Sequence, residues 1–168
     1  MAQHLRVLKK WTGKKNATLL YDSSVDELSA DELFAKVANK PNIALVNVQE
    51  NGEIIGVFYA AAVKSQGAYV KDPDVFIFAL EANGRFRTPK HFTVKWHVRD
   101  SMAVVFFQNS SDNWFQAGVM YFGALQLGKT SASEARSLDG AFRRMKRIDL
   151  LDYKTSRQCV RLLAIQLW

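Results

Sequence analysis

The sequence predicts an α+β fold: a two-sheet antiparallel β-sandwich with peripheral helices. At least seven segments of strand length are rich in apolar and β-branched residues, whereas helix signals are confined mainly to residues 30–39 and 133–147. The runs IALVNV and IIGVFYAAAV, which flank Asn51-Gly52, are apolar at nearly every position. This pattern indicates a hairpin that is covered on both faces and lies at the centre of a sheet.

Composition limits the class of protein. A chain of 168 residues suits one domain, and 48% hydrophobic with 12% aromatic residues excludes global disorder. The single cysteine, Cys159, excludes an internal disulfide, and no signal-like apolar segment follows Met1. No apolar run reaches the roughly 18 residues of a membrane span. We therefore expect a soluble protein of a reduced intracellular compartment, cytoplasmic or also nuclear.

Residues 1–15 carry five basic and no acidic side chains, with Leu5, Val7, Leu8 and Trp11 between them. Two interpretations stay open at this point. The segment is a basic arm for nucleic acid or anionic lipid, or its apolar residues dock on the domain while the lysines stay in solvent. We expect a docked arm over residues 1–18 and a single domain over residues 19–168.

A strand over Thr18–Tyr21 and a helix after it are the next expected elements. Ser29-Ala30-Asp31-Glu32 fits a capping box, in which Ser29 accepts from a first-turn amide and Glu32 reaches back to the cap. Leu33, Phe34 and Val37 would then face inward, and Pro41 would end the helix. The acids of this region lack the spacing of a calcium loop, so capping is preferred over metal binding.

The turn signals divide the middle of the chain into hairpins. Asn51-Gly52 predicts a type I′ turn, and Asn83-Gly84 gives a second hairpin signal after the apolar strand Val75–Glu81. Between them, the loop Gly67–Asp74 ends in Asp72-Pro73-Asp74. Two carboxylates around a proline would serve as a cation site, but a plain turn is the preferred interpretation.

Residues 91–99 alternate with a period of two, which predicts a strand with one buried and one basic face. The expected inward residues are Phe92, Val94, Trp96 and Val98. His91 and His97 share the outer face about 20 Å apart, too far to bind one metal ion together. The sequence therefore predicts no metal site and no cofactor.

The last third is expected to return to strands. Ala103–Gln108 and Trp114–Phe122 are two strand candidates whose aromatic residues form core or, alternatively, a stacking surface. Ser131–Glu134 fits another capping box for a helix over 133–147, although Gly140 weakens one long helix. Gln158–Trp168 is expected to be a final strand with Trp168 locked in the core.

The net charge of +7 falls mainly in three basic zones, residues 6–15, 85–99 and 143–161. Contacts of this kind with nucleic-acid phosphates would make affinity fall by about 10³ or more between 50 and 200 mM salt. The alternative is a solvated basic surface that contributes mainly to solubility. No helix-turn-helix, zinc-finger or ribonucleoprotein signature is visible. The candidate anion or nucleic-acid contacts are Lys9, Lys10, Lys14, Lys15, Arg85, Arg87, Lys95, Arg99, Arg143, Arg144, Lys146 and Arg147.

Four motifs follow one another in a distinctive order. The segment IALVNVQENGEIIGVFYAAAV is followed by DPDVFIFAL, by the pair Phe122-Gly123 and by a last strand, LLAIQLW, that ends in tryptophan. This order resembles the TLDc domain of the oxidation-resistance proteins. The resemblance begins at Leu19, where LLYDSS looks like the family's opening strand and turn, and runs to Trp168. Gln166-Leu167-Trp168 replaces the family's usual Glu-Val-Trp, so a divergent member is expected.

The resemblance implies a β-sandwich in a family linked to protection against oxidative stress, some of whose members bind the vacuolar proton ATPase. It implies no catalytic centre, and the sequence itself contains no nucleophile elbow, phosphate-binding glycine loop or metal-ligand spacing. Cys159 lies in an apolar strand, where packing is preferred over a redox role, although Arg157 and Arg161 are close in sequence.

Three functional hypotheses follow. The first is a non-enzymatic protein-interaction domain in the oxidative-stress response. The second is a nucleic-acid-binding, regulatory protein. The third is a hydrolase or redox enzyme whose site is assembled from distant loops. The first is our main hypothesis, and convergence of the basic zones on one concave surface would favour the second.

Overall fold

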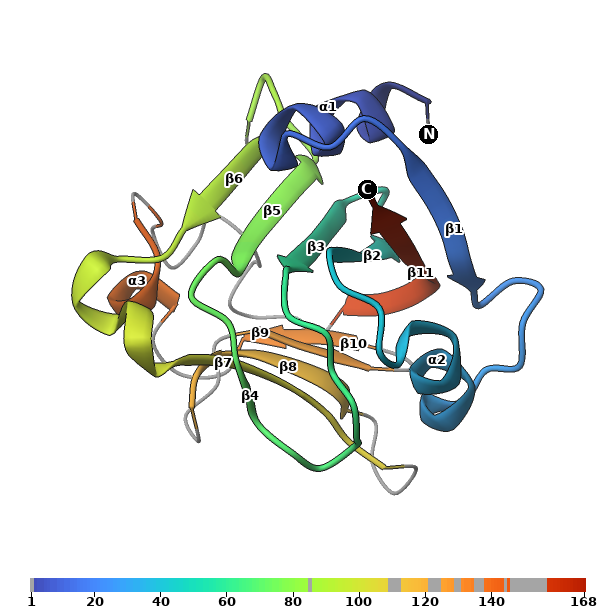
Figure 1. Cartoon of the computed structure of the whole chain (residues 1–168). Helices are drawn as coiled ribbons and strands as arrows, with labels where there is room; N and C mark the ends of the chain where they lie inside the picture. Colours follow the sequence, from blue (N-terminus) through green and yellow to red (C-terminus); the bar gives the residue numbers. More distant parts are fainter. Residues whose placement is uncertain are drawn as a thin grey trace.

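The chain forms two antiparallel β-sheets packed face to face, which confirms the predicted fold class (Figure 1). The computed structural model describes residues 2–84, 86–108, 113–120, 125–128, 131–134, 138–143, 145 and 157–168. The first sheet has the order β1-β11-β2-β3-β5-β6, and the second has the order β4-β7-β8-β9-β10. All described pairings between strands are antiparallel.

The strands and helices have the following bounds. The first sheet contains β1 (Ala17–Asp22), β2 (Ile43–Gln49), β3 (Ile54–Tyr59), β5 (Phe76–Glu81), β6 (Lys90–Thr93) and β11 (Arg157–Leu167). The second contains β4 (Val70–Lys71), β7 (Met102–Phe106), β8 (Asn113–Val119), β9 (Leu125–Gly128) and β10 (Ser131–Glu134). The helices are α1 (Ala2–Thr12), α2 (Ala30–Val37), the 3₁₀ helix η1 (Trp96–Ser101) and α3 (Leu138–Ala141).

Strand β11 joins the two layers. Most of its length pairs with β2 on one side, and its last residues pair with β1 on the other. Its first residues, Arg157 and Gln158, pair instead with β10 of the second sheet. The predicted last strand is therefore confirmed, and it is the element through which the two hydrogen-bonded layers are continuous.

The predicted central hairpin is confirmed, but its turn type was wrong. β2 pairs with β3 in the register Val48↔Ile54, and both strands are flanked by further strands. Gly52 has a positive φ of 83°, whereas Asn51 does not. Since the Gly52 amide donates to the Gln49 carbonyl, the loop is a type I turn followed by a left-handed glycine, a common solution for longer hairpin loops.

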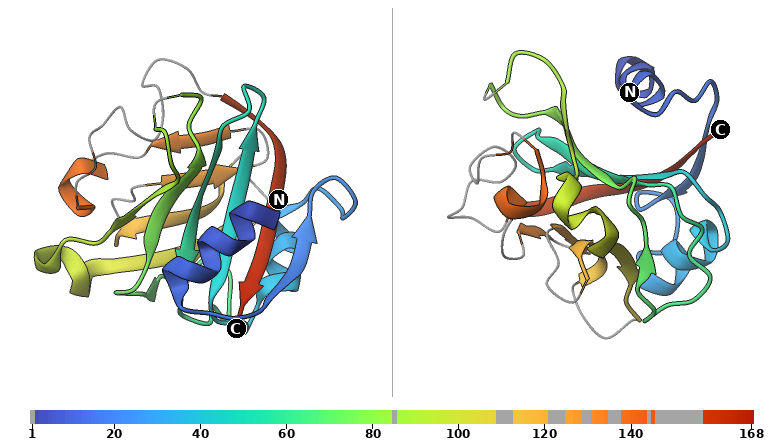
Figure 2. Two further views of the ribbon diagram at one scale, coloured as in Figure 1. Left: turned by 90° about the horizontal axis from the view of Figure 1, so that it is seen from above. Right: turned by 60° about the vertical axis from the view of Figure 1, so that its left-hand side comes forward.

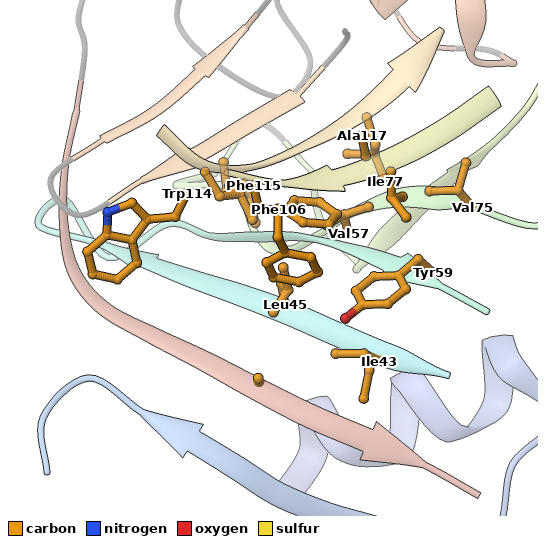
Figure 3. Packing of buried hydrophobic residues seen from close by; sticks show 14 of the residues in the cluster. Ile43, Leu45, Val57, Tyr59, Val75, Ile77, Phe106, Trp114, Phe115 and Ala117 are labelled. Atoms are coloured by element: carbon orange, nitrogen blue, oxygen red, sulfur yellow. The ribbon is translucent and has the colours of Figure 1, made fainter. Parts of the chain in front are cut away.

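The main core lies between the sheets (Figure 3). Tyr59 of the first sheet contacts two rings of the second, with ring centroids 5.9 Å from Phe106 and 5.6 Å from Phe115. Phe106 and Phe115 themselves are 4.8 Å apart. The aromatic residues of β7 and β8 are thus core, and they do not form the stacking surface considered as an alternative.

A second core lies on the outer face of the first sheet, under α1. Leu8 is only 1% exposed, and Leu5 and Trp11 pack against the same apolar cluster. The Trp11 ring lies 6.4 Å from Phe76 and 4.7 Å from His91. Figure 2 shows α1 on the side of the first sheet opposite the second sheet. The apolar residues of the basic arm therefore dock, in a helix whose basic residues flank that contact.

Helix α2 begins as predicted but has half of the capping box. The Ser29 hydroxyl accepts from the Glu32 amide at 3.0 Å. The Ser29 amide donates to the Glu27 carbonyl, and the Glu32 carboxylate pairs with Lys36 at 3.3 Å. The reciprocal bond from the Ser29 amide to the Glu32 carboxylate is absent, because each of these two groups is bonded to another partner.

Three other expectations were wrong. Ser131–Glu134 forms strand β10 and does not cap a helix, and the helix that follows spans only Leu138–Ala141. The Gly67–Asp74 loop contains the short strand β4, which pairs with β7. Leu167 is buried as expected, but the Trp168 side chain is 59% exposed. Its backbone is nevertheless held, since Trp168 and Asn16 exchange two amide–carbonyl bonds of 2.8 and 3.1 Å.

Residues 95–99 also depart from the predicted strand. Strand β6 ends at Thr93, which pairs with Phe76, the first residue of β5. Beyond this point β5 offers no partner, because the Asp72–Asp74 turn leads the chain away. Residues 96–101 therefore turn into η1, and Trp96 points into solvent instead of into the core. The alternation of apolar and polar residues in one strand does not show where the neighbouring strand begins, and so does not predict where the pairing ends.

Candidate interaction surface

Strand β6 is an edge strand, at the opposite end of the first sheet from β1. The Thr93 carbonyl accepts from the Arg143 amide at 2.7 Å, so the Thr93 backbone faces away from β5. Because backbone direction repeats every second residue, the N–H and C=O groups of His91 face outward as well. Within the described part of the chain, no hydrogen bond meets them on this side.

A groove of about 530 Å³ runs along this edge. The described residues of its walls are those of β6, Pro89 before it, and Arg143. Lys90 lies at one end, with its Nζ 4.0 Å from the centroid of the Phe86 ring. The groove therefore combines exposed strand backbone with positive charge.

A second groove of about 300 Å³ adjoins the first and shares Thr93 and Arg143 with it. Trp96 and Arg99 of η1 form its other wall. Trp96 is 78% exposed, far more than a tryptophan in a core. An exposed aromatic ring beside cations is typical of a binding surface rather than of packing.

Asp72 fixes the turn beside this second groove. Its carboxylate is 1% exposed and accepts from the amides of Ala60, Ala61 and Asp74 at 2.6, 3.0 and 3.0 Å. Burial raises the pKa of this carboxyl, and the three amide bonds oppose that shift. Asp74 pairs with Arg99 at 2.7 Å. Since the oxygens of Asp72 are directed at amides, the structure shows the predicted turn and not a shared cation site.

The structure brings some of the predicted basic residues together. Arg99 and Arg143, from two different basic zones, line the same groove. Lys95 directly precedes η1. Its amide donates to the Ala141 carbonyl at 2.9 Å and so joins it to the 138–143 segment. We call the surface formed by Lys90, His91, Thr93, Trp96, Arg99 and Arg143 the β6–η1 surface.

Other predicted basic residues lie elsewhere. Lys9 and Lys10 belong to the last turn of α1, with Lys14 and Lys15 after it, on the outer side of the first sheet. Arg87 lines a separate small pocket of about 100 Å³ with Gln3 and Glu81. Predictions for four residues lie outside the described part of the chain: Arg85, Arg144, Lys146 and Arg147.

Arg161, within the third basic zone, is occupied by a structural role. Its guanidinium donates two hydrogen bonds to Asp22, one of them 2.9 Å from Nε to Oδ1, and so ties β11 to β1. The Arg161 pairing, helped by Ser24, holds the pKa of the Asp22 carboxyl well below its usual range. This pair lies at the opposite end of the first sheet from the β6–η1 surface, so the three zones do not converge as wholes.

Sequence reasoning did not select Lys90 or Trp96 as site residues. Trp96 was assigned to a buried strand face, and only the change to 3₁₀ geometry turns it outward. Lys90 directly follows Pro89 at the start of the strand. Its position within the basic 85–99 zone is the sequence feature that could have identified it as a site residue.

Cys159 does not have the surroundings of a reactive thiol. It is half-buried against the main core, and burial raises its pKa to about 11. Nearby Arg161 is engaged by Asp22. Across the described residues, no three His, Cys, Asp or Glu side chains lie close enough to bind a metal ion together.

Comparison with models of protein families shows to which family the chain belongs. The model of the TLDc domain matches residues 1–144, which is most of the chain. The chain belongs to the TLDc domain family. No curated protein matches it.

The TLDc match includes α1, β6, η1 and the whole 138–143 segment, and thus every residue of the β6–η1 surface. It starts before Leu19, where the resemblance was expected to begin, and ends before β11. The division into an arm over 1–18 and a domain over 19–168 stays a prediction. Among the described helices of this TLDc chain, none has the length and apolar character that crossing a membrane requires.

Proposed function

We propose that this TLDc chain is a non-enzymatic protein-interaction domain of the oxidative-stress response, and that it binds its partner at the β6–η1 surface. One observation supports the place of binding above others. Lys90, Arg99, Arg143 and the exposed Trp96 line two adjoining grooves. Among the described lining residues, Asp74 is the one acid, and it already pairs with Arg99. Tryptophan and arginine are the side chains enriched at binding hot spots.

The absence of catalysis is part of the proposal. TLDc domains are generally non-catalytic. The two buried acids of known environment, Asp22 and Asp72, are engaged by Arg161 and by backbone amides. The Cys159 thiol has a raised pKa, which opposes the thiolate form needed of a nucleophile. Asp22, Asp72 and Cys159 thus each have a structural explanation.

The family resemblance suggests the vacuolar proton ATPase as a partner, which would place the protein on the cytosolic side of the membranes that carry this enzyme. The proposal requires only that the partner presents an acidic surface, because the β6–η1 surface is basic.

The test compares two charge-changing variants in cells of the source organism exposed to peroxide. The variant Trp96→Ala/Arg143→Glu alters the β6–η1 surface. The control Arg6→Glu/Lys10→Glu alters exposed basic residues of α1 by more charge. The amount of co-purifying protein should fall by at least about tenfold in the first variant and stay unchanged in the second. Peroxide survival should likewise be lost in the first variant and retained in the second. Equal retention, or no effect on survival, would contradict the proposal.

Nucleic-acid binding is the second candidate, because cations and an exposed tryptophan share one groove. The dispersal of the α1 lysines and the engagement of Arg161 by Asp22 reduce the number of phosphates that one strand would meet. Titration with a 20-mer of single-stranded DNA and of RNA at 50 and 200 mM salt distinguishes the two. The nucleic-acid hypothesis requires tight binding with a steep salt dependence, and the interaction hypothesis predicts only weak, nonspecific binding.

A further inference from the structure

We propose that the β6 edge binds an acidic, extended segment of a partner protein by β-strand addition, with the partner's backbone bonded to His91 and Thr93. This inference rests on the proposed function and specifies how the partner is held. In strand addition, backbone hydrogen bonds supply affinity and the alternating side chains supply specificity. The edge, the charge and the groove volume each support it.

The backbone groups of the edge have the right direction. Outward-facing residues alternate along β6, so the carbonyl of Pro89, both polar groups of His91 and the amide of Thr93 point toward the groove. Proline has no N–H to offer, so a bound strand would be fixed in register by His91 and Thr93. Edge strands with such free groups are templates for a further strand.

The next part of the same edge already carries an added strand from within the chain. Phe142 forms an antiparallel bridge with Val94, and two bonds flank it: Arg143 N–H to Thr93 C=O at 2.7 Å and Lys95 N–H to Ala141 C=O at 2.9 Å. Met145 is described and makes no such bridge. The edge therefore accepts an antiparallel neighbour at 93–95, and no other described residue pairs with this edge beside Lys90 to Phe92.

Charge selects the partner's side chains. Among the described residues that line the groove along β6, Lys90 and Arg143 are charged and none is acidic. An extended segment places alternate side chains on one face, about 6.6 Å apart. Glutamate or aspartate at alternate positions would therefore meet the two cations while the backbone follows His91. A volume of about 530 Å³ suits a short segment and not a folded element.

The probe is a fluorescein-labelled eight-residue peptide in which glutamate alternates with valine, measured by anisotropy against the full chain. Two further peptides carry N-methyl groups on alternate amides, one in each frame. Only one frame of amides faces β6 in an added strand. We expect one methylated peptide to bind at least about tenfold more weakly, because several backbone bonds are lost, and the other to bind like the parent. An equal effect in both frames would overturn strand addition.

Two variants of the protein test the same hydrogen bonds by changing β6 in place of the peptide. His91→Pro removes the outward amide, a change that edge strands tolerate. His91→Ala keeps this amide while removing the same imidazole. The proline variant should lose binding by at least about tenfold and the alanine variant should keep it. Should the proline variant fail to fold, amide exchange replaces it: the His91 and Thr93 amides of the unaltered chain should be protected by the parent peptide.

The outcomes separate this inference from the function on which it rests. Loss of co-purifying proteins in the Trp96→Ala/Arg143→Glu variant, without protection of the His91 amide by any peptide, retains the interaction surface and overturns strand addition. Binding of the single-stranded DNA 20-mer in the same groove, in place of the peptide, also overturns it. If neither that variant nor any peptide shows an effect, both proposals fail together.

Discussion

Gly56 lies at a crowded point of the central hairpin. A Cβ at this position would lie 2.2 Å from the Leu45 carbonyl oxygen and 2.4 Å from a ring carbon of Phe78. Gly56→Ala should therefore lower the free energy of unfolding by about 3 kcal/mol, because strand backbone and a packed ring both have to move. Urea denaturation measures the change.

Gly13→Ala is the matched control for Gly56→Ala. Gly13 has a φ of 70° and no atom within 4 Å of the added Cβ, so only backbone strain of about 1–2 kcal/mol is expected. An equal loss of unfolding free energy in Gly56→Ala and Gly13→Ala would contradict the idea that close packing against Gly56 stabilises the hairpin.

Asp22 and Asp74 each pair with an arginine, but Asp22 is buried and Asp74 is exposed. Asp22 is 4% exposed and bonds Arg161, whereas the Asp74–Arg99 pair lies in solvent. Asp22→Asn should cost about 2 kcal/mol, since the buried carboxylate loses its charge-assisted hydrogen bonds to Arg161, whose side chain is 43% exposed. Asp74→Asn should cost no more than about 1 kcal/mol. Thermal unfolding at neutral pH compares them, and an equal cost would contradict the assignment of Asp22 as the tie between β1 and β11.

The Asp22 pair also has a pH signature. Arg161 holds the pKa of the folded-state carboxyl well below its ordinary value, so this group stabilises the fold fully above about pH 4. The contribution is lost as the pH falls from that value through the folded-state pKa. The stability difference between the unaltered chain and Asp22→Asn should therefore shrink between pH 6 and pH 2, measured by urea midpoints. A difference that grows on acidification would contradict the pairing.

Cys159 is expected to be a slow thiol. With a pKa of about 11, it is almost wholly protonated at neutral pH. Alkylation by iodoacetamide should proceed about a hundredfold more slowly than for a cysteine of pKa about 8.5 in the urea-unfolded chain. Peroxide survival should be unchanged in Cys159→Ser. Fast labelling of the folded chain would instead support a redox role.

At the scale of elements, α1 is a structural helix whose apolar side covers the first sheet. Leu8→Ala should lower the free energy of unfolding by about 2–4 kcal/mol, because the buried side chain leaves a cavity over the sheet. Arg6→Ala, at an exposed position of the same helix, should change it by less than about 0.5 kcal/mol. Denaturant unfolding tests both. Similar values would mean that α1 does not stay docked in solution.

Elements dominated by their own side-chain pattern could be predicted from the sequence. The runs on either side of the Asn51-Gly52 turn and the Ser29 cap belong to this class, because hydrophobicity and capping are local properties. The turn type of Asn51-Gly52 could not be predicted, since the dipeptide suits more than one loop and the register decides between them. The exposure of Trp96 depends on where β5 begins, which is a property of another segment.

At the scale of the whole molecule, charge distribution decides the function that we propose. Composition gave a net charge of +7 but not its arrangement. The fold brings Arg99 and Arg143 to one edge, uses Arg161 to tie two strands, and leaves the α1 lysines on another face. Arg99 and Arg143, from two zones, thus share one environment, whereas Arg143 and Arg161, from one zone, have different ones. Pairing between distant strands produces this difference, so no local pattern predicts it.

The central claim is that partners meet the protein at the β6–η1 surface, and site-specific photo-crosslinking tests it most directly. A benzoylphenylalanine replaces either Trp96 or Val25, which are 78% and 81% exposed and lie near opposite ends of the first sheet. After irradiation of peroxide-treated cells, position 96 should give defined protein adducts that contain acidic segments, and position 25 should give none of them. Adducts at position 25 alone, or the same adducts at both positions, would contradict the account.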